Sequence, residues 1–293
     1  MKILVFGKTG QLARALRGNG DERLTIISLN RDQCDLAHLD RIEFAIARED
    51  PDAVINAAAY TAVDKAEGEP ALAMALNGTA PAAISAACKQ AGLPLVHVST
   101  DYVFDGLKTE PYGESDPVAP QSVYGRSKAA GEDAVLGSGA NAAIIRTSWV
   151  YSAQGSNFVR TMLSLAATRD EISVIADQVG RPTWASDLAR ACLAAAQALA
   201  AREKNASGVF HYSGAGDATW ADFAEAIFAE AAKRGLPSAR VRPVTTAEYP
   251  TAAKRPPNSR LDTRKIEQVL GVPVRPWRDA LALCMDEIAA HPA

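Results

Sequence analysis

Short apolar runs that end in small or polar residues recur along the first half of the chain. Each is four to six residues long and is followed by a segment whose apolar residues recur with helical spacing. This pattern predicts buried parallel strands joined by helices. The predicted strands are residues 2–6, 24–29, 53–56, 95–99 and 142–146. The predicted helices follow Gly10 and Asp35 (as a cap), span residues 81–90, and begin at Tyr124.

From about residue 155 the alternation weakens and Ala-rich amphipathic helices dominate. We expect helices at 157–167, 186–201, 219–234 and 276–290, short strands at 172–176, 209–213 and 240–244, and a long loop at 246–264. The expected fold class is α/β, with a Rossmann-type doubly wound parallel sheet. We assign residues 1–152 to a nucleotide-binding domain, with later segments returning to it, and residues 153–293 mainly to a smaller, mainly helical substrate domain.

The amino-acid composition argues against several classes of binding partner. Apolar residues make up 48% and charged residues 22% of the 293 residues, and the net charge is −3 without a long basic block. We therefore expect no binding to nucleic acid or to a membrane. The four cysteines are far apart and the four histidines are scattered, which argues against disulfides and a metal cluster. Met1 leads directly into a strand without a signal-peptide pattern, so we expect a cytoplasmic protein.

A glycine turn follows the first predicted strand. Gly7 and Gly10 are followed by Gln11 and Leu12, in the spacing G-x-x-G-x-x-A. Glycines let the backbone approach a pyrophosphate, which binds the free N–H groups of the following helix. The turn lacks the G-K-[ST] ending of an ATP-binding loop and resembles the short-chain dehydrogenase variant. A glycine turn without a ligand is the competing interpretation.

Two further strand ends carry candidate cofactor residues. Asn30 and Arg31 follow the second strand, where an arginine accommodates the 2′-phosphate of NADP, so the pair favours NADPH over NADH. A solvated Arg31 remains an equal alternative. Small residues after the third strand, including Ala58 and Ala59 before Tyr60 and Thr61, let a flat cofactor lie against the backbone. A tight helix–strand contact would explain the same residues.

The strongest chemical signal lies between Thr100 and Lys128. Thr100 and Asp101 follow a predicted buried strand, at the end of the sheet where ligands bind. Tyr124 and Lys128 are four residues apart, hence on one face of a helix. A cation beside the phenol lowers its pKa and favours proton transfer. We infer that Thr100, Tyr124 and Lys128 reduce a ketone, or oxidise an alcohol, against a nicotinamide.

Three other residues are ambiguous at this stage. His97, on an apolar strand, is more typical of a core histidine than of a catalyst. Trp149, just past a strand, fits either the core or a platform for a sugar or a base. Arg255, in the long loop, could hold a diphosphate or be solvated.

The combination of motifs resembles the extended short-chain dehydrogenases, most specifically the dTDP-4-dehydrorhamnose reductases. The matching segments are G-K-T-G-Q-L at 7–12, N-A-A-A-Y-T-A-V-D-K-A-E at 56–67, V-S-T-D-Y-V-F-D-G at 98–106, Y-G-R-S-K at 124–128, R-T-S-W-V-Y at 146–151, R-P-T at 181–183 and R-P-P-N-S-R-L-D at 255–262. The resemblance implies reduction of dTDP-4-dehydro-β-L-rhamnose by NADPH, or by NADH, to dTDP-L-rhamnose for surface polysaccharide.

The same resemblance implies residue roles. Tyr124 resembles the proton donor, Lys128 its partner that holds the nicotinamide ribose, and Thr100 the catalytic hydroxyl. Implied cofactor contacts are Gly7, Gly10, Gln11, Leu12, Asn30, Arg31, Asp35, Leu36, Ala58, Ala59, Tyr60, Thr61, Tyr124 and Lys128. Implied substrate contacts are Val63, Thr100, Asp101, Tyr102, Trp149 and Arg255.

One feature departs from the family pattern. Some members dimerise through a magnesium ion held by glutamates, whose positions correspond here to Ala15 and Ser186, so that only Glu287 matches. Magnesium prefers carboxylates and water. We therefore expect no structural magnesium and a monomer, with a homodimer as the alternative.

Two other functions are compatible with the motifs. A sugar-nucleotide dehydratase or epimerase would recycle a tightly held NAD, but the dehydratases carry an Asp-Glu pair where Asp101 is followed here by Tyr102. A non-catalytic relative would bind NADP and regulate a partner enzyme. The presence of Thr100, Tyr124 and Lys128 argues against that role.

Overall fold

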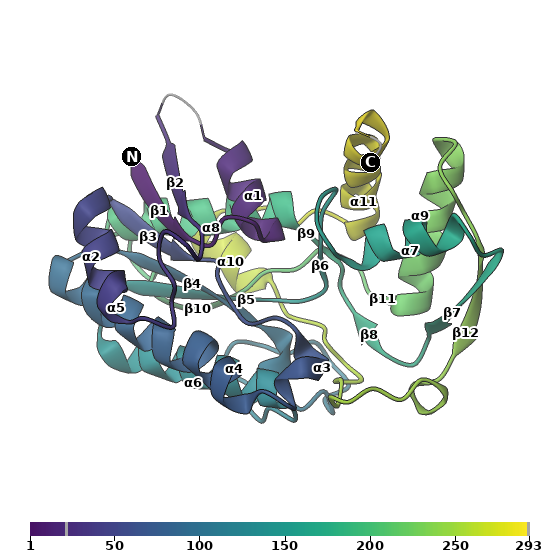
Figure 1. Ribbon diagram of the computed structural model, residues 1–293, viewed down its shortest axis with the longest axis horizontal. Helices are drawn as coiled ribbons and strands as arrows, with labels where there is room; N and C mark the ends of the chain where they lie inside the picture. The colour runs from purple at the N-terminus through teal and green to yellow at the C-terminus, as the bar shows by residue number, and fades with distance from the viewer. Residues whose placement is uncertain (21–22, 292–293) are drawn as a thin grey trace.

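The computed structural model describes residues 1–20 and 23–291, which form two lobes side by side (Figure 1). The larger lobe contains a six-stranded sheet in the order β10-β5-β4-β3-β1-β2. Each neighbouring pair in it is parallel, which confirms the predicted doubly wound sheet. Its strands are β1 (Lys2–Phe6), β2 (Thr25–Leu29), β3 (Ala53–Asn56), β4 (Leu95–Thr100), β5 (Ala142–Thr147) and β10 (Gly208–His211).

Helices cover both faces of this sheet (Figure 1). On one face, α1 (Gln11–Gly18) packs against α8 (Ala185–Ala200), beside α10 (Arg264–Leu270). On the other face lie α2 (Asp40–Glu49), α5 (Ala80–Ala91) and α6 (Val123–Ser138). The shorter helices α3 (Val63–Ala66), α4 (Pro70–Met74) and a π-helical turn, η1 (Ala75–Thr79), lead into α5.

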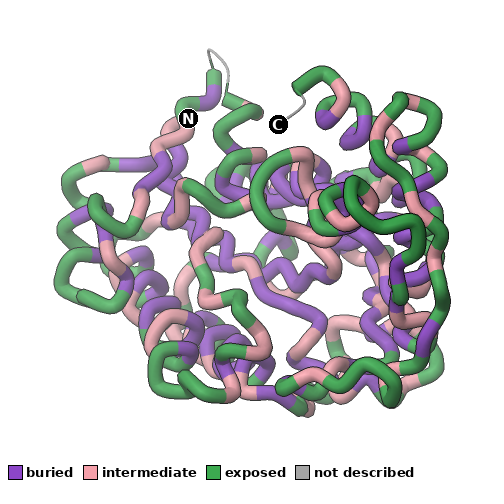
Figure 2. Tube along the Cα trace, turned by 45° about the vertical axis from the view of Figure 1, so that its right-hand side comes forward, coloured by how far each residue is buried: buried purple, intermediate pink, exposed green. Residues whose placement is uncertain are grey.

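The central strands are buried on both faces. Every residue of β3 and β5 is buried, as Figure 2 shows for the middle of the larger lobe. Burial on both faces explains why these strands read as continuous apolar runs rather than as alternating ones. The four cysteines are likewise buried and free, in agreement with the sequence.

The smaller lobe is built from the second half of the chain. Its helices α7 (Phe158–Ala166) and α9 (Trp220–Lys233) pack on the parallel pair β7 (Glu171–Ile175) and β12 (Arg240–Val244), and α11 (Trp277–Ala290) packs on α9 (Figure 1). Two short pairs complete it, β6 (Val150–Tyr151) with β9 (Thr183–Trp184) and β8 (Val179–Gly180) with β11 (Ala218–Thr219). One 3₁₀ turn, η3 (Thr246–Glu248), follows β12, and another, η2 (Asp101–Val103), follows β4 in the larger lobe. A separate apolar cluster around Tyr151, Phe223 and Trp277 forms its core.

Three later elements return to the larger lobe. β10 extends the sheet beside β5, α8 packs on α1, and α10 packs on α8 and β10. The helix and strand bounds differ from the predicted ones by only one or two residues at α7, α8, α9 and α11. The division into a nucleotide-binding domain up to residue 152 and a substrate domain after it stays a prediction.

The helix expected after Asp35 begins later than predicted. α2 starts at Asp40, and the cap assigned to Asp35 is wrong. Asp35 instead accepts hydrogen bonds from the backbone N–H of Ala37 and from Arg31, at 3.0 Å each. Aspartate side chains compete in this way with helix formation, because they bond the backbone two residues on in a local turn.

Several elements were not predicted from the sequence. They are the helical segments α3, α4, η1, η2, η3 and α10 and the two-residue strands β6, β8, β9 and β11, all of them short. Within the described residues, the run Pro70–Ala91 is a helix long and apolar enough to cross a membrane. Half of its most apolar window is buried inside the protein, as in the core helix of a globular fold.

Candidate active site

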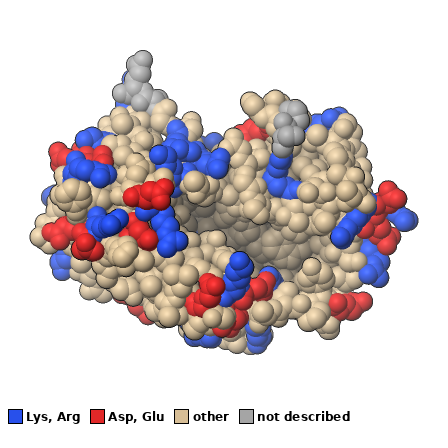
Figure 3. Space-filling model, viewed as in Figure 1, with Lys and Arg blue, Asp and Glu red and all other residues tan. Residues whose placement is uncertain are grey.

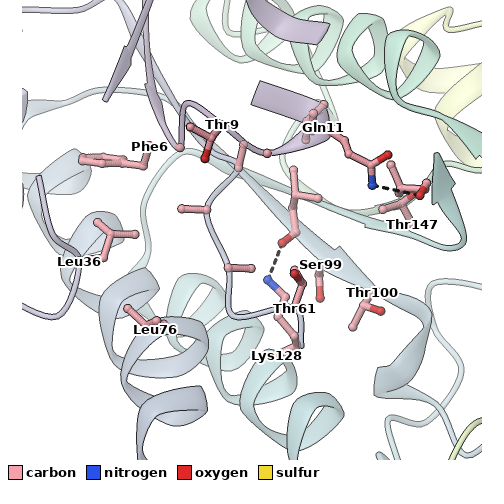
Figure 4. Close-up of a pocket in the computed structure, with 18 of the residues that line it drawn as sticks. Phe6, Thr9, Gln11, Leu36, Thr61, Leu76, Ser99, Thr100, Lys128 and Thr147 are labelled. Carbon is pink, nitrogen blue, oxygen red and sulfur yellow. Dashed lines mark hydrogen bonds between the residues drawn. The ribbon is translucent and has the colours of Figure 1, made fainter. Parts of the chain in front are cut away.

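A cavity of about 750 Å³ lies where the carboxyl ends of the sheet strands face the smaller lobe (Figures 3 and 4). Ligands of doubly wound sheets bind at these strand ends, beside the point where the strand order reverses. Here the reversal falls between β1 and β3. The volume is typical of a site for a small organic ligand. The predicted residues that line it are Gly7, Gly10, Gln11, Leu12, Asn30, Arg31, Asp35, Leu36, Ala58, Ala59, Thr61, Val63, Thr100, Asp101, Tyr102, Tyr124, Lys128 and Trp149.

Two predicted contacts lie outside this lining. The Tyr60 hydroxyl donates a hydrogen bond to Glu69 at 2.5 Å, away from the cavity. The Arg255 guanidinium is bonded to Asp64 through two of its nitrogens, at 3.0 and 2.9 Å. The structure therefore brings neither side chain to the cavity wall.

The glycine turn between β1 and α1 has the geometry that a phosphate site needs. Gly7 has a φ of +111°, and a Cβ on it would lie 3.3 Å from backbone atoms of Ala57 and Ala58. A residue with a side chain is therefore strained at this position. Gly10 caps α1 in an extended conformation and has no side chain to occupy the first N–H groups of the helix. These N–H groups can donate hydrogen bonds to a bound anion.

The ends of β2 and β3 form the next parts of the wall. Arg31 lies at the exposed rim, and its ion pair with Asp35 is 3.0 Å long. After β3, the backbone of Tyr60 is held by Asn77, which accepts from its N–H at 2.8 Å and donates to its carbonyl at 3.0 Å. Asn77 also donates to Ser127 of α6. Asn77 was not predicted as a site residue, because it lies in the unpredicted π-helical turn η1.

Thr100 and Asp101 form a bonded pair at the end of β4. The Thr100 hydroxyl donates to Asp101 Oδ1 at 3.0 Å and accepts from the Tyr102 N–H at 3.2 Å. Burial raises the pKa of Asp101 to about 6, against hydrogen bonds from Ser259 and Thr100. A buried carboxyl of this kind changes its charge close to neutral pH.

Tyr124 and Lys128 occupy the first turns of α6, as predicted. Ser122 caps this helix by accepting from the Gly125 N–H at 3.1 Å. A Cβ on Gly125 would collide with the Tyr102 carbonyl, so glycine lets the helix pack directly on the turn η2 that follows β4. This close contact brings the Tyr124 phenol next to Thr100.

The expected lowering of the Tyr124 pKa by Lys128 is wrong. Burial raises the pKa of Tyr124 to about 12, and a hydrogen bond with Thr100 only partly opposes it. Lys128 Nζ donates instead to the Val98 carbonyl at 2.6 Å (Figure 4). Burial lowers the pKa of Lys128 itself to about 8, while Glu132 opposes this change. Desolvation by burial, and not the charge of Lys128, therefore sets the direction of the change in the Tyr124 pKa.

Trp149 lies at the border between the lobes. Its ring stacks on Trp220 with centroids 3.6 Å apart and an interplanar angle of 10°. Its backbone φ is +48°, and a Cβ on Gly180 would collide with the ring. Such strain in a residue with a side chain is typical of functional sites. Trp220 was not predicted, because nothing near it in sequence indicates the stack.

Further hydroxyls line the cavity that sequence reasoning did not single out. Thr9, Ser99, Thr147 and Ser148 belong to this group (Figure 4 labels the first three). The polar residues that follow the apolar run of β5 were a usable signal for Thr147 and Ser148. Figure 3 shows that charged side chains gather on the rim of the hollow rather than in its depth.

The chain is similar to known proteins over nearly its whole length. The family model described as RmlD substrate binding domain matches residues 1–290. A dTDP-4-dehydrorhamnose reductase of Sinorhizobium fredii is 44% identical, over 96% of this chain and 95% of the relative. A crystal structure of a dTDP-4-dehydrorhamnose reductase from Clostridium acetobutylicum has a TM-score of 0.91 at 38% identity and covers 98% of this chain and 99% of that one. The enzyme of that name from Bacillus anthracis, in complex with NADP, has a TM-score of 0.90 at 34% identity with the same coverage. The chain therefore belongs to the dTDP-4-dehydrorhamnose reductase family of extended short-chain dehydrogenases.

Proposed function

We propose that this protein reduces the 4-keto group of dTDP-4-dehydro-β-L-rhamnose to dTDP-L-rhamnose, the last step of dTDP-rhamnose synthesis for surface polysaccharide. The observation that carries the proposal is the position of Thr100, Tyr124 and Lys128 in one cavity with the glycine turn after β1. Family membership over residues 1–290 supports the same activity.

A nicotinamide dinucleotide fits the residues around the glycine turn. Gly7 lets the turn pass close to the backbone of Ala57 and Ala58, and the first N–H groups of α1, which no side chain caps, are free to bind a phosphate. The dinucleotide supplies hydride when it is bound. Arg31, exposed at the rim beside Asn30, supports NADPH as the preferred form, with NADH as the alternative. The Bacillus anthracis relative was solved in complex with NADP, which agrees with this choice.

The proton of the product alcohol comes from Tyr124. With a pKa near 12, its phenol stays protonated throughout the neutral range, and it is still a stronger acid than the product alcohol, so it can protonate the alkoxide. Thr100, bonded to Asp101 and to Tyr124, aligns the second hydroxyl on the same substrate oxygen. The Lys128 ammonium stabilises the negative charge that develops as the proton leaves.

Substrate contacts are proposed for the side of the cavity next to the smaller lobe. Asp101 and Tyr102 lie there with Val63 and Trp149. The stacked Trp149 ring offers a flat apolar surface for a sugar or a base. Arg255 acts on the diphosphate only if it leaves its pair with Asp64.

A coupled assay tests the activity. Purified protein is incubated with dTDP-4-dehydro-6-deoxyglucose, the 3,5-epimerase and NADPH, and nicotinamide absorbance is followed. We expect stoichiometric loss of NADPH and formation of dTDP-L-rhamnose only when the epimerase is present. Turnover of a nucleotide sugar without net NADPH consumption would indicate a dehydratase or an epimerase instead. Binding of NADP without turnover of any substrate would indicate a regulatory protein.

The protein is proposed to act as a cytoplasmic monomer without structural magnesium. Among residues 1–20 and 23–291, no group of three or more His, Cys, Asp or Glu side chains is arranged to hold a metal. Ala15 on α1 and Ser186 on α8 cannot replace carboxylate ligands, and Glu287 alone is too few for magnesium. Gel filtration with and without EDTA tests this point, and a dimer that the chelator dissociates would contradict it.

A further inference from the structure

A chain of three buried side chains lies beneath the cavity. It runs from Asn56 at the end of β3 through His97 of β4 to Lys128 of α6, and their exposed fractions are 1%, 0% and 2%. Asn56 Nδ2 lies 3.1 Å from His97 Nδ1, and His97 Nε2 lies 3.5 Å from Lys128 Nζ. Because the three groups are withdrawn from solvent, their donors and acceptors must match one another.

The orientation of Asn56 decides the first of these contacts. Its Oδ1 accepts the backbone N–H of Ala58 at 3.2 Å, so the amide nitrogen faces the ring of His97. An amide NH₂ group only donates. His97 Nδ1 must therefore present a lone pair, and the neutral ring carries its proton on Nε2.

This tautomer directs an N–H group at Lys128. An ammonium has three donors and no acceptor, so an Nε2–H group and a protonated Lys128 oppose each other. The lone pair of a neutral amine accepts a hydrogen bond from the Nε2–H group. It still donates to the Val98 carbonyl, which lies 2.6 Å from Nζ.

We propose that His97, fixed as the Nε2–H tautomer by Asn56, is a positioning residue that favours the neutral amine of Lys128. His97 thereby sets the pH at which the lysine gains its charge. The tautomer of His97 and the pKa of Lys128 can be measured whether or not the protein is a reductase. Their effect on turnover rests on the proposed function. Lys128 lines the cavity, so its ammonium group gains and loses its proton at the cavity wall.

Other charged groups around α6 do not remove this effect. Glu132, one turn further along the helix, favours the ammonium, but its carboxylate is bonded to Arg146 of β5 through three short contacts. Tyr124, on the same helix, stays neutral, and Asp101 of η2 is bonded to Thr100. Burial lowers the pKa of His97 well below its ordinary value, so its ring remains neutral.

The second buried histidine provides a matched contrast. His211 Nδ1 lies 3.0 Å from the Tyr112 carbonyl, which only accepts, so this nitrogen must carry the proton. Its Nε2 then offers a lone pair to Arg146 Nη1 at 3.4 Å. Both ring nitrogens of His211 thus face a suitable partner, one acceptor and one donor. The ring of His97 has a suitable partner at both nitrogens only when Lys128 is neutral.

The tautomers can be read directly by long-range ¹H–¹⁵N NMR correlation on the full chain at pH 7. We expect His97 to carry its proton on Nε2 and His211 to carry it on Nδ1 in the same spectrum. A His97 ring protonated on Nδ1 would overturn the proposal. The measurement needs no turnover, so it is independent of the reductase assay.

A second measurement follows the charge of Lys128. In protein labelled with ¹³C-lysine, the Cε signal missing from Lys128→Met identifies the residue, and its titration should centre near pH 8. In His97→Gln, an amide oxygen can accept from the ammonium, so the midpoint should rise by about one unit. The control His211→Gln should leave it in place. An unchanged midpoint in a folded His97→Gln protein contradicts the proposal.

Discussion

The guanidinium of Arg255 pairs with the carboxylate of Asp64 through two hydrogen bonds, 3.0 Å from Nη1 to Oδ1 and 2.9 Å from Nη2 to Oδ2. Asp64 belongs to α3 of the larger lobe, whereas Arg255 lies in the long segment that follows β12. The backbone N–H of Ala253 donates to the same carboxylate at 3.0 Å. These bonds tie the two segments together beside the cavity.

If the ion pair of Asp64 and Arg255 shapes the substrate side of the cavity, loss of either residue should weaken substrate binding to the same extent. Asp64→Ala and Arg255→Ala should each raise KM for the nucleotide sugar by roughly 2–5-fold with little change in kcat, because a partly exposed pair is worth about 0.5–1 kcal/mol. The double variant should bind no worse than either single one. If Arg255 contacts the diphosphate itself, Arg255→Ala alone will raise KM. Arg240→Ala, in an exposed pair with Glu171, is the control.

The pH dependence of kcat/KM should report Lys128. Burial lowers its pKa from 10.5 to about 8, so the ammonium is lost as the pH rises through this value. Activity should therefore fall above about pH 8. Tyr124 stays protonated far beyond this range and adds no limb there. A kcat/KM profile that is flat up to pH 10, measured on protein shown to remain folded, would contradict this assignment.

Asp101 should lower the stability of the fold above pH 6. Its pKa is raised from 3.8 to about 6 by burial, so its contribution is fully present below pH 3.8 and is lost as the pH rises through 6. Two pKa units correspond to about 3 kcal/mol. Asp101→Asn, which keeps an acceptor for Thr100, should be more stable than the parent at pH 8 by up to this amount. The two should converge near pH 4 in urea denaturation, and equal stability at pH 8 would refute the idea.

The buried pair of Glu132 and Arg146 predicts a larger effect. Both side chains are less than 5% exposed, and Glu132→Gln would leave the guanidinium charge uncompensated. We expect a loss of about 3–5 kcal/mol in the free energy of unfolding. Glu171→Gln, which breaks an exposed pair with Arg240, should cost under about 1 kcal/mol. Comparable losses in the two variants would show that burial of the first pair does not matter.

Much of the fold and part of the site follow from local sequence. The strands β1, β3, β4 and β5 are continuous apolar runs because both of their faces are covered, and polar residues mark their ends. The glycine turn and the spacing of Tyr124 and Lys128 are likewise local, so the structure places them in one cavity as expected.

What the sequence left open depends on contacts between distant residues. Asp35 turns the chain instead of capping α2, because Arg31 and Ala37 compete for its carboxylate. The direction of the Tyr124 pKa change depends on how deeply α6 is packed, which helical spacing does not reveal. The Trp149–Trp220 stack joins segments of the chain whose local patterns carry no sign of each other.

The role of Tyr124 is the central claim, and one variant tests it most directly. Removing its hydroxyl in Tyr124→Phe takes away the proton donor while leaving the glycine turn and the strand ends that hold the dinucleotide. In single-turnover reduction of the 4-keto sugar, the rate should fall by roughly 10²–10⁴-fold, and the Kd for NADPH should change little. A Tyr124→Phe protein that reduces the sugar at the parental rate would contradict the account.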